Sequence, residues 1–237
     1  MVFSKQASPN AKEAIVTDNL DLAGRPVVIF DFDGTVADTK ASIISTATTV
    51  LRAWGIPEED LVRVDQIIGP PFPQAFEEVF GLSHDDAVEV TRRYRDIYNY
   101  LGVESWPAFL GMTDLLDHLR MAGKRLAIAS SKRRYLVKKG LEDNGIDGLF
   151  DSVCAKRHDG METKADCIRQ AMSDLGAGVA DAVMVGDRHH DVDAAGECGI
   201  PCVGVLYGQT ADRRELEEAG AAAIANTVAD LESLLLE

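Results

Sequence analysis

Two aspartates separated by one residue, Asp31 and Asp33, directly follow the short apolar run Val27–Phe30. The run is four residues long and rich in β-branched side chains, which predicts a buried strand. Gly34 then turns the backbone, so both carboxylates fall at the carboxyl end of that strand. Carboxylates in such a place are costly unless a cation or a proton compensates their charge. Because an Asp-x-Asp pair on its own also fits a solvated acidic turn, its meaning depends on what the rest of the chain supplies.

The composition is that of a globular protein with an acidic surface. The chain has 237 residues, 46% of them hydrophobic and 27% charged, enough for one core and a small insert. Its net charge of −15 argues against a nucleic-acid polymer or an anionic membrane as a partner. A small phosphorylated metabolite remains compatible, because a divalent cation and a few local bases can reverse the field within a site.

Four cysteines show neither a C-x-x-C pair nor the spacing of a disulfide framework. The sequence also has no apolar leader and no apolar run of membrane-spanning length. We therefore expect a cytoplasmic protein with reduced thiols, either a monomer or a homodimer.

The segments after residue 24 follow two patterns. Residues 39–107 predict one helix after another, whereas apolar runs at 126–129, 149–153, 182–185, 202–205 and 222–225 alternate with helical segments. Such alternation predicts right-handed crossovers and a mainly parallel sheet covered on both faces. We predict an α/β fold: a Rossmann-like core of residues 25–38 and 108–237, interrupted by an all-helical insert of residues 39–107. Residues 1–24 are expected to be an N-terminal extension, with one short helix around Lys12–Asn19.

Polar side chains follow several of the predicted strands. Ser130 and Ser131 follow the strand 126–129, Asp187 and Asp191 follow the strand 182–185, and Lys164 begins a helix after Asp159-Gly160. Ligands of open α/β sheets bind beyond the carboxyl ends of the strands. We therefore expect these groups to meet Asp31 and Asp33 at one edge of the sheet.

In this order, Asp-x-Asp-Gly-Thr, a strand ending in serine, a later lysine and Gly-Asp-x-x-x-Asp resemble the four motifs of the haloacid-dehalogenase superfamily. The resemblance covers nearly the whole chain after residue 24. The helical insert is similar to the cap of the phosphoglycolate-phosphatase-like branch.

The resemblance implies a role for each residue. Asp31 would be the nucleophile that forms an aspartyl-phosphate, and Asp33 the general acid and base. Ser130 and Lys164 would complete the catalytic set by binding phosphoryl oxygens. Magnesium would be held by Asp31, the backbone carbonyl of Asp33 and Asp187, with Asp191 as a supporting outer residue. The substrate would be bound by Gly34, Thr35, Ser130, Ser131 and Lys164.

Several of these residues also have plain structural explanations. Ser130 and Asp191 could each cap a helix. His189 and His190 lie between the acidic residues, but a surface pair in a turn explains them better than a metal site. The proline-rich turn Gly69–Pro73 could reach the substrate, or could simply end a helix.

The reaction implied by the resemblance is hydrolysis of a small phosphate monoester with Mg²⁺. Asp33 argues against dehalogenase and phosphonatase chemistry, because such sites lack this second carboxylate. Phosphoglycolate and nucleoside 5′-monophosphates are the leading substrates. A phosphomutase acting on a sugar phosphate and a non-catalytic, phospho-ligand-binding regulator remain as alternatives.

Overall fold

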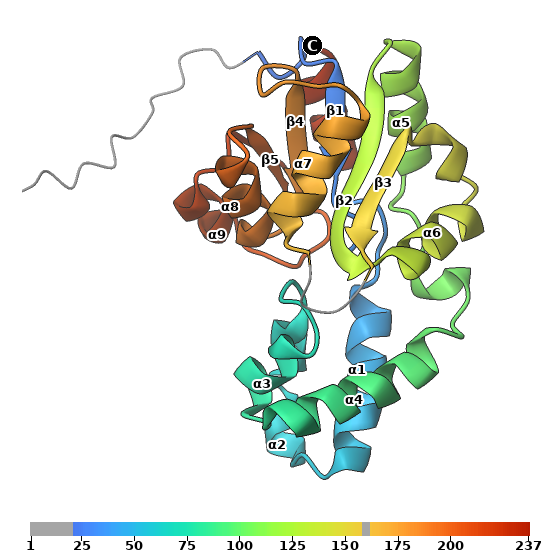
Figure 1. Cartoon of the computed structure of the whole chain (residues 1–237), viewed down its shortest axis with the longest axis vertical. Coiled ribbons are helices and arrows are strands. Elements are labelled where there is room, and N and C mark those ends of the chain that lie inside the picture. Colours follow the sequence, from blue (N-terminus) through green and yellow to red (C-terminus); the bar gives the residue numbers. More distant parts are fainter. Residues whose placement is uncertain (1–20, 158–161) are drawn as a thin grey trace, which may run out of the picture.

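The computed structural model describes residues 21–157 and 162–237, and it shows a sheet between two layers of helices with a further group of helices beyond one end of the sheet (Figure 1). The helix predicted around Lys12–Asn19 and the pair Asp159-Gly160 lie outside the described residues.

The sheet has six strands, all parallel, in the order β3-β2-β1-β4-β5-β6. Their bounds are β1 Val27–Phe30, β2 Arg125–Arg133, β3 Ser152–Lys156, β4 Ala182–Gly186, β5 Cys202–Val205 and β6 Ala223–Ala225. The chain builds outward from β1 on one side and then crosses to β4 on the other. This is the strand order of a Rossmann-like sheet, and the predicted fold class is confirmed.

The alternation of side chains along each strand explains why both faces are covered. Val28 and Phe30 of β1 pack with α5, α6 and α10, whereas Val27 and Ile29 pack with α7, α8 and α9. Because β1 is completely buried on both sides, it reads as an unbroken apolar run. The helices of these layers are α5 Met112–Met121, α6 Arg134–Asp143, α7 Lys164–Asp174, α8 His189–Glu197, α9 Arg213–Ala219 and α10 Val228–Leu236.

Residues 39–107 contain only helices, as predicted, and lie beyond the carboxyl ends of β2 and β3 in Figure 1. Their bounds are α1 Lys40–Trp54, α2 Glu58–Leu61, α3 Gln74–Phe80 and α4 His84–Tyr98, with short 3₁₀ turns at Val64–Ile67 and Val103–Ser105. The two segments that lead into and out of this helical region run side by side, because the amide of Asp38 donates to the carbonyl of Pro107 at 2.8 Å.

Two strands differ from their predicted bounds by more than one residue. β3 begins at Ser152, because Leu149 belongs to a 3₁₀ turn that precedes it. β2 continues to Arg133 instead of ending at Ala129, since a register shift after Ser130 allows Arg133 to pair with Lys156. Ser130, Ser131 and Lys132 therefore lie within an irregular strand end. The pairing of β2 with β1 ends at Ile128, and beyond it β2 pairs only with β3.

The packing of α6 on Phe32, which follows β1, predicts a stability difference between two glycines. A methyl group at Gly140 would come within 2.4 Å of the Phe32 ring, whereas one at Gly196 in α8 would meet nothing within 4 Å. Gly140→Ala should lose about 1–3 kcal/mol through overpacking, which outweighs a helix-propensity gain of about 1 kcal/mol. Gly196→Ala should keep that gain. Urea unfolding of both variants checks the difference, and equal stability of the two would contradict the packing described.

Candidate active site

The Asp31–Asp33 turn is held at the carboxyl end of β1 by its neighbours. The amide of Asp31 donates to the carbonyl of Val185 in β4 at 2.9 Å, and the side chain of Asp31 is only 9% exposed. Gly34 has a φ of +72°, and a Cβ there would lie 2.2 Å from the Asp187 carboxylate. A glycine is required at this point both by the backbone and by the approach of β4.

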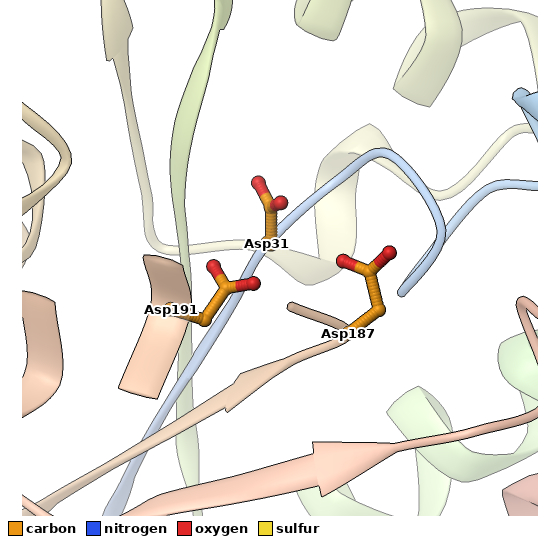
Figure 2. Close-up of side chains that lie close together, drawn as sticks. All are labelled: Asp31, Asp187 and Asp191. Carbon is orange, nitrogen blue, oxygen red and sulfur yellow. The ribbon is translucent and has the colours of Figure 1, made fainter. Parts of the chain in front are cut away.

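Three buried carboxylates, from Asp31, Asp187 and Asp191, meet at this edge (Figure 2). One oxygen of each lies within 4.8 Å of the others. Burial, together with the neighbouring charges of Asp191 and Asp31, raises the pKa of Asp187 to about 8. Burial likewise raises the pKa of Asp31 to about 6, although Lys164 opposes the shift.

Lys164 is the counter-ion of this cluster. Its Nζ lies 2.7 Å from Oδ2 of Asp31 and also donates to Oδ1 of Asp191. Burial alone would lower the pKa of this ammonium, but the charges of Asp191 and Asp31 raise it above its usual value. Thr163 fixes the position of the lysine, because its side chain caps α7 immediately before Lys164 in a reciprocal capping box with Asp166.

The oxygens of the cluster differ in what they already bind. Asp191 uses both of them, one on Lys164 and the other on the backbone amide of Arg188 at 3.1 Å. Oδ1 of Asp31, in contrast, is buried with no hydrogen-bond partner among the described residues. An orphaned carboxylate oxygen beside Asp187 is a suitable ligand for a hard cation. Asp31 therefore has an oxygen free to bind a cation, whereas both oxygens of Asp191 already have partners. This is consistent with the predicted roles of Asp31 as a metal ligand and of Asp191 as an outer support.

A segment after β5 supports Asp187. Thr210 donates its hydroxyl to Oδ2 of Asp187, and Thr35 donates to Oδ1 at 3.3 Å. The Tyr207 hydroxyl donates to the carbonyl of Thr35 at 2.8 Å, and Gly208 packs so closely on Gly34 that a Cβ would lie 2.3 Å from its carbonyl oxygen. Our sequence analysis did not single out Thr210, although it follows a strand as the other site residues do.

A cavity opens between this edge and the helical region. The core contributes Asp31, Asp33, Ser130, Ser131, Lys132, Arg133, Leu136, Lys156, Lys164, Asp187, Arg188, His190 and Asp191, and the helical region contributes Ile43, Ile67, Ile68, Gly69, Pro70, Pro71, Phe72, Tyr94, Arg95 and Tyr98. The turn Gly69–Pro73 thus supplies four of the lining residues. The cavity has charged groups on its core side and mainly apolar and aromatic groups on the other.

The residues expected to bind substrate divide into two groups. Ser130, Ser131 and Lys164 line the cavity, whereas Gly34 and Thr35, both described, are not among its lining residues. The Thr35 hydroxyl instead faces Asp187. Ser130 is buried, and its Oγ accepts a hydrogen bond from the amide of Lys132 at 3.3 Å.

Comparison with known proteins identifies the family. The family described as haloacid dehalogenase-like hydrolase matches residues 28–205. The chain belongs to the haloacid dehalogenase-like hydrolase family.

Relatives in this family carry different names. A 5′-nucleotidase of Pseudomonas aeruginosa is 32% identical over 184 residues, which are 77% of this chain and 83% of that protein. The tyrosine-protein kinase PtkA of Mycobacterium tuberculosis is 37% identical over 185 residues, or 77% of this chain, but the match spans only 62% of the kinase. A crystal structure of a predicted phosphatase from Clostridium acetobutylicum superimposes with a TM-score of 0.84 at 33% identity, covering 90% of this chain and 98% of that one.

Two further cations of this hydrolase, which the sequence analysis did not single out, join the core to the helical region. Lys132 lies between Asp33 and Tyr98, with Nζ 2.7 Å from Oδ1 of Asp33. Arg188 is bound by Glu215 at 2.8 Å and donates to the carbonyl of Ile68. Arg188 follows Asp187 in the sequence, and Lys132 contacts Asp33 in space. No sequence motif indicates the residues of the helical region that these two cations contact.

The two histidines of the Gly-Asp-x-x-x-Asp motif have different environments. His189 contacts Glu215 through Nδ1 at 2.8 Å, away from the carboxylate cluster. His190 lines the cavity, and burial lowers its pKa. Both histidines begin α8 instead of lying in a turn as expected. The side chain of His189 is 38% exposed, so it fits the expected surface position better than His190.

No helix in residues 21–157 and 162–237 has the length and apolar character needed to span a bilayer.

The raised pKa of Asp187 predicts how the metal-free protein responds to pH. An unfolded aspartate has a pKa of about 3.9, so the folded state holds this proton more tightly than the unfolded state. Stability from this group is therefore fully present below about pH 4 and is lost as the pH rises toward 8. In EDTA, Asp187→Asn should melt above the wild type at pH 8, and the difference should shrink toward pH 5. A constant difference in thermal unfolding across this range would contradict the assigned burial.

Proposed function

We propose that this hydrolase is a Mg²⁺-dependent phosphatase that cleaves a small phosphate monoester through an aspartyl-phosphate on Asp31. One observation carries the proposal: Oδ2 of Asp31 is paired with Lys164, while Oδ1 is buried beside Asp187 without a hydrogen-bond partner in residues 21–157 and 162–237, in a cavity that Asp33 also lines. A buried aspartate with one oxygen held by a lysine and the other open to a cation is arranged for attack on an anionic phosphoryl group.

In the first step a carboxylate oxygen of Asp31 attacks phosphorus, and the bond from phosphorus to the leaving oxygen breaks. The electron pair stays on that oxygen, which takes a proton from Asp33. In the second step water attacks the phosphorus, gives a proton to Asp33 and releases the Asp31 carboxylate. Lys164 neutralises Asp31 before the reaction and the phosphoryl oxygens during it, and Ser130 lines the cavity from the neighbouring parallel strand β2.

Magnesium fits the donors present. Asp31 and Asp187 offer carboxylate oxygens and the Asp33 backbone offers a carbonyl, which are the oxygen ligands that Mg²⁺ prefers. When bound, the ion would neutralise charge on the phosphoryl group. Asp191 serves as an outer support, because its oxygens are already held by Lys164 and the Arg188 amide.

Residues 25–38 and 108–237 form the catalytic core in this proposal, and residues 39–107 form a cap that closes over the substrate. The two linkers that meet at Asp38 and Pro107 support this division. Because they lie side by side, the cap can move relative to the core by bending at these two linkers alone. Nucleoside 5′-monophosphates and phosphoglycolate are the leading substrates, the former supported by the relative named 5′-nucleotidase. The four free cysteines support a reducing, cytoplasmic location.

Activity on phosphate esters tests the proposal. The purified protein should release phosphate from a nucleoside 5′-monophosphate, from phosphoglycolate or from an aryl phosphate with Mg²⁺, and EDTA should abolish the reaction. Asp31→Asn should reduce the rate to the uncatalysed level, because no nucleophile remains.

Three other outcomes would favour other functions. Isomerisation of a hexose 1-phosphate without phosphate release would indicate a phosphomutase. Transfer from ATP to a tyrosine would indicate a kinase like the relative named PtkA. Binding of phosphate esters without metal-dependent turnover across the panel would indicate a regulator.

The support of Asp187 by Thr210 predicts an effect on metal affinity. Thr210→Val removes the hydroxyl that orients the carboxylate, so the apparent Mg²⁺ affinity should fall by about 10–100-fold. Thr91→Val is a matched control, because the buried Thr91 hydroxyl has no partner among the described residues and lies in α4. The Mg²⁺ affinity of both variants is measured from the rise in thermal unfolding temperature as Mg²⁺ is added. An equal affinity in the two variants would refute the role of Thr210.

A further inference from the structure

A buried ammonium connects the expected acid–base residue of the core to the cap. Lys132 belongs to β2, and its Nζ donates to Oδ1 of Asp33 at 2.7 Å and to the hydroxyl of Tyr98 at 3.2 Å. The lysine side chain is 7% exposed, compared with 22% for Asp33. Because Tyr98 is the last residue of α4, this one amine touches both parts of the protein.

The surroundings of Lys132 explain why it stays charged and fixed. Its Nζ lies 4.7 Å from the centroid of the Tyr98 ring and 5.8 Å from that of Phe32, within reach of a cation–π interaction. Burial alone would lower its pKa, but Asp33 and Tyr98 raise it above the usual value. The amine therefore depends on Tyr98 for its ring and for its hydroxyl, and on Asp33 for its counter-charge.

Tyr98 in turn is fixed by the cap. Its ring stacks on Tyr94 at 5.0 Å with an interplanar angle of 18° and contacts Trp106 at 5.6 Å. Its hydroxyl lies 3.3 Å from Oγ of Ser42, and that Oγ donates to the carbonyl of Ser105 at 2.5 Å. Ser42 and Ser105 lie near the two ends of the helical region. The position of the Tyr98 hydroxyl is therefore fixed relative to both segments that connect the cap to the core.

We propose that Lys132 is a positioning residue, which holds the carboxylate of Asp33 in its working orientation only while Tyr98 of the docked cap holds Lys132. This inference rests on the proposed phosphatase function. When the cap moves away, the lysine loses the ring and hydroxyl of Tyr98 and becomes exposed to water, where an ion pair with Asp33 constrains little. Cap docking thereby completes the acid–base group, whereas Asp31 and Lys164 are assembled within the core alone.

The arrangement has a specific chemical consequence. Lys132 occupies Oδ1 of Asp33, so Oδ2 carries the proton that passes to the leaving oxygen as its bond to phosphorus breaks. A poorly oriented Asp33 slows departure of a basic leaving group, which needs that proton, more than departure of a stabilised phenolate, which does not. A loss that depends on the leaving group is therefore the mark of a positioning role.

A series of substituted phenyl phosphates, from 4-nitrophenyl to phenyl and 4-methoxyphenyl phosphate, tests the proposal because its members differ mainly in leaving-group basicity. The value of kcat/KM reports the step in which the phenol leaves and not the later hydrolysis. In Lys132→Met and in Tyr98→Phe, kcat/KM should fall by about tenfold or more on phenyl phosphate but by less than about threefold on 4-nitrophenyl phosphate. Thermal unfolding identifies any variant that fails to fold. If Lys132→Met does not fold, the result for Tyr98→Phe, which keeps the lysine and the aromatic ring, decides whether the proposal holds.

The chain offers a matched control for each variant. Lys139 also pairs with an aspartate, Asp143 at 2.7 Å, and lies 5.2 Å from an aromatic ring, that of Trp106, but it is not among the residues lining the cavity. The Tyr135 hydroxyl also links the core to the end of α4, through Asn99 at 2.7 Å. Lys139→Met and Tyr135→Phe should both keep the wild-type dependence on leaving-group basicity.

The remaining outcomes overturn the inference in distinguishable ways. An equal fall in kcat/KM across the series in Lys132→Met, or no fall, would overturn the positioning role. A leaving-group effect in Lys132→Met but not in Tyr98→Phe would overturn the dependence on the cap. If the wild-type protein with Mg²⁺ hydrolyses neither this series nor nucleoside 5′-monophosphates nor phosphoglycolate, the proposed phosphatase function fails, and the inference fails with it.

Discussion

The burial of like charges at the carboxyl edge of the sheet is the constraint on which the rest of this structure depends. Three carboxylates with oxygens within 4.8 Å of one another cannot all ionise in a poorly solvated site without compensation. Lys164 supplies one positive charge between Asp31 and Asp191, but the pKa of Asp187 still rises to about 8. A cation bound beside these carboxylates would relieve the remaining imbalance. The surrounding backbone is specialised to hold the three carboxylates this close together.

That specialisation is visible in the close approaches around the cluster. A Cβ at Gly186 would lie 2.2 Å from Cγ of Asp191, and a Cβ at Gly208 would lie 2.3 Å from the carbonyl oxygen of Gly34. Glycines at these points let β4 and the segment after β5 come close enough to hold the carboxylates. The strand order provides the setting, since β1 and β4 are neighbours where the chain reverses its direction of growth.

The sequence was sufficient to predict the sheet and the cluster because both follow from local patterns. Apolar runs located the strands, and the rule that ligands bind beyond strand ends selected Asp31, Asp187 and Lys164 before any contact was known. Thr210 also follows a strand, but a lone threonine five residues beyond the end of β5 has no pattern to mark it. Lys132 is more instructive: its role depends on Asp33, which is 99 residues away in the chain, and on how α4 docks. A contact between side chains of two segments that are far apart in the sequence produces no periodic pattern by which it could be predicted.

The contacts between the cap and the core suggest how selection of a substrate is linked to its reaction. Two cations that join the core to the helical region lie beside carboxylates of the site: Lys132 binds Asp33, and Arg188 follows Asp187 and contacts Ile68, just before the proline-rich turn. A cap that sits incorrectly would therefore disturb these two carboxylates directly. Asp31 and Lys164, in contrast, are held by β1, α7 and α8 without any contribution from the cap. In the proposed mechanism the nucleophile is thus positioned before the substrate binds, whereas a poorly fitting substrate would leave the proton-transfer group, Asp33, incompletely oriented.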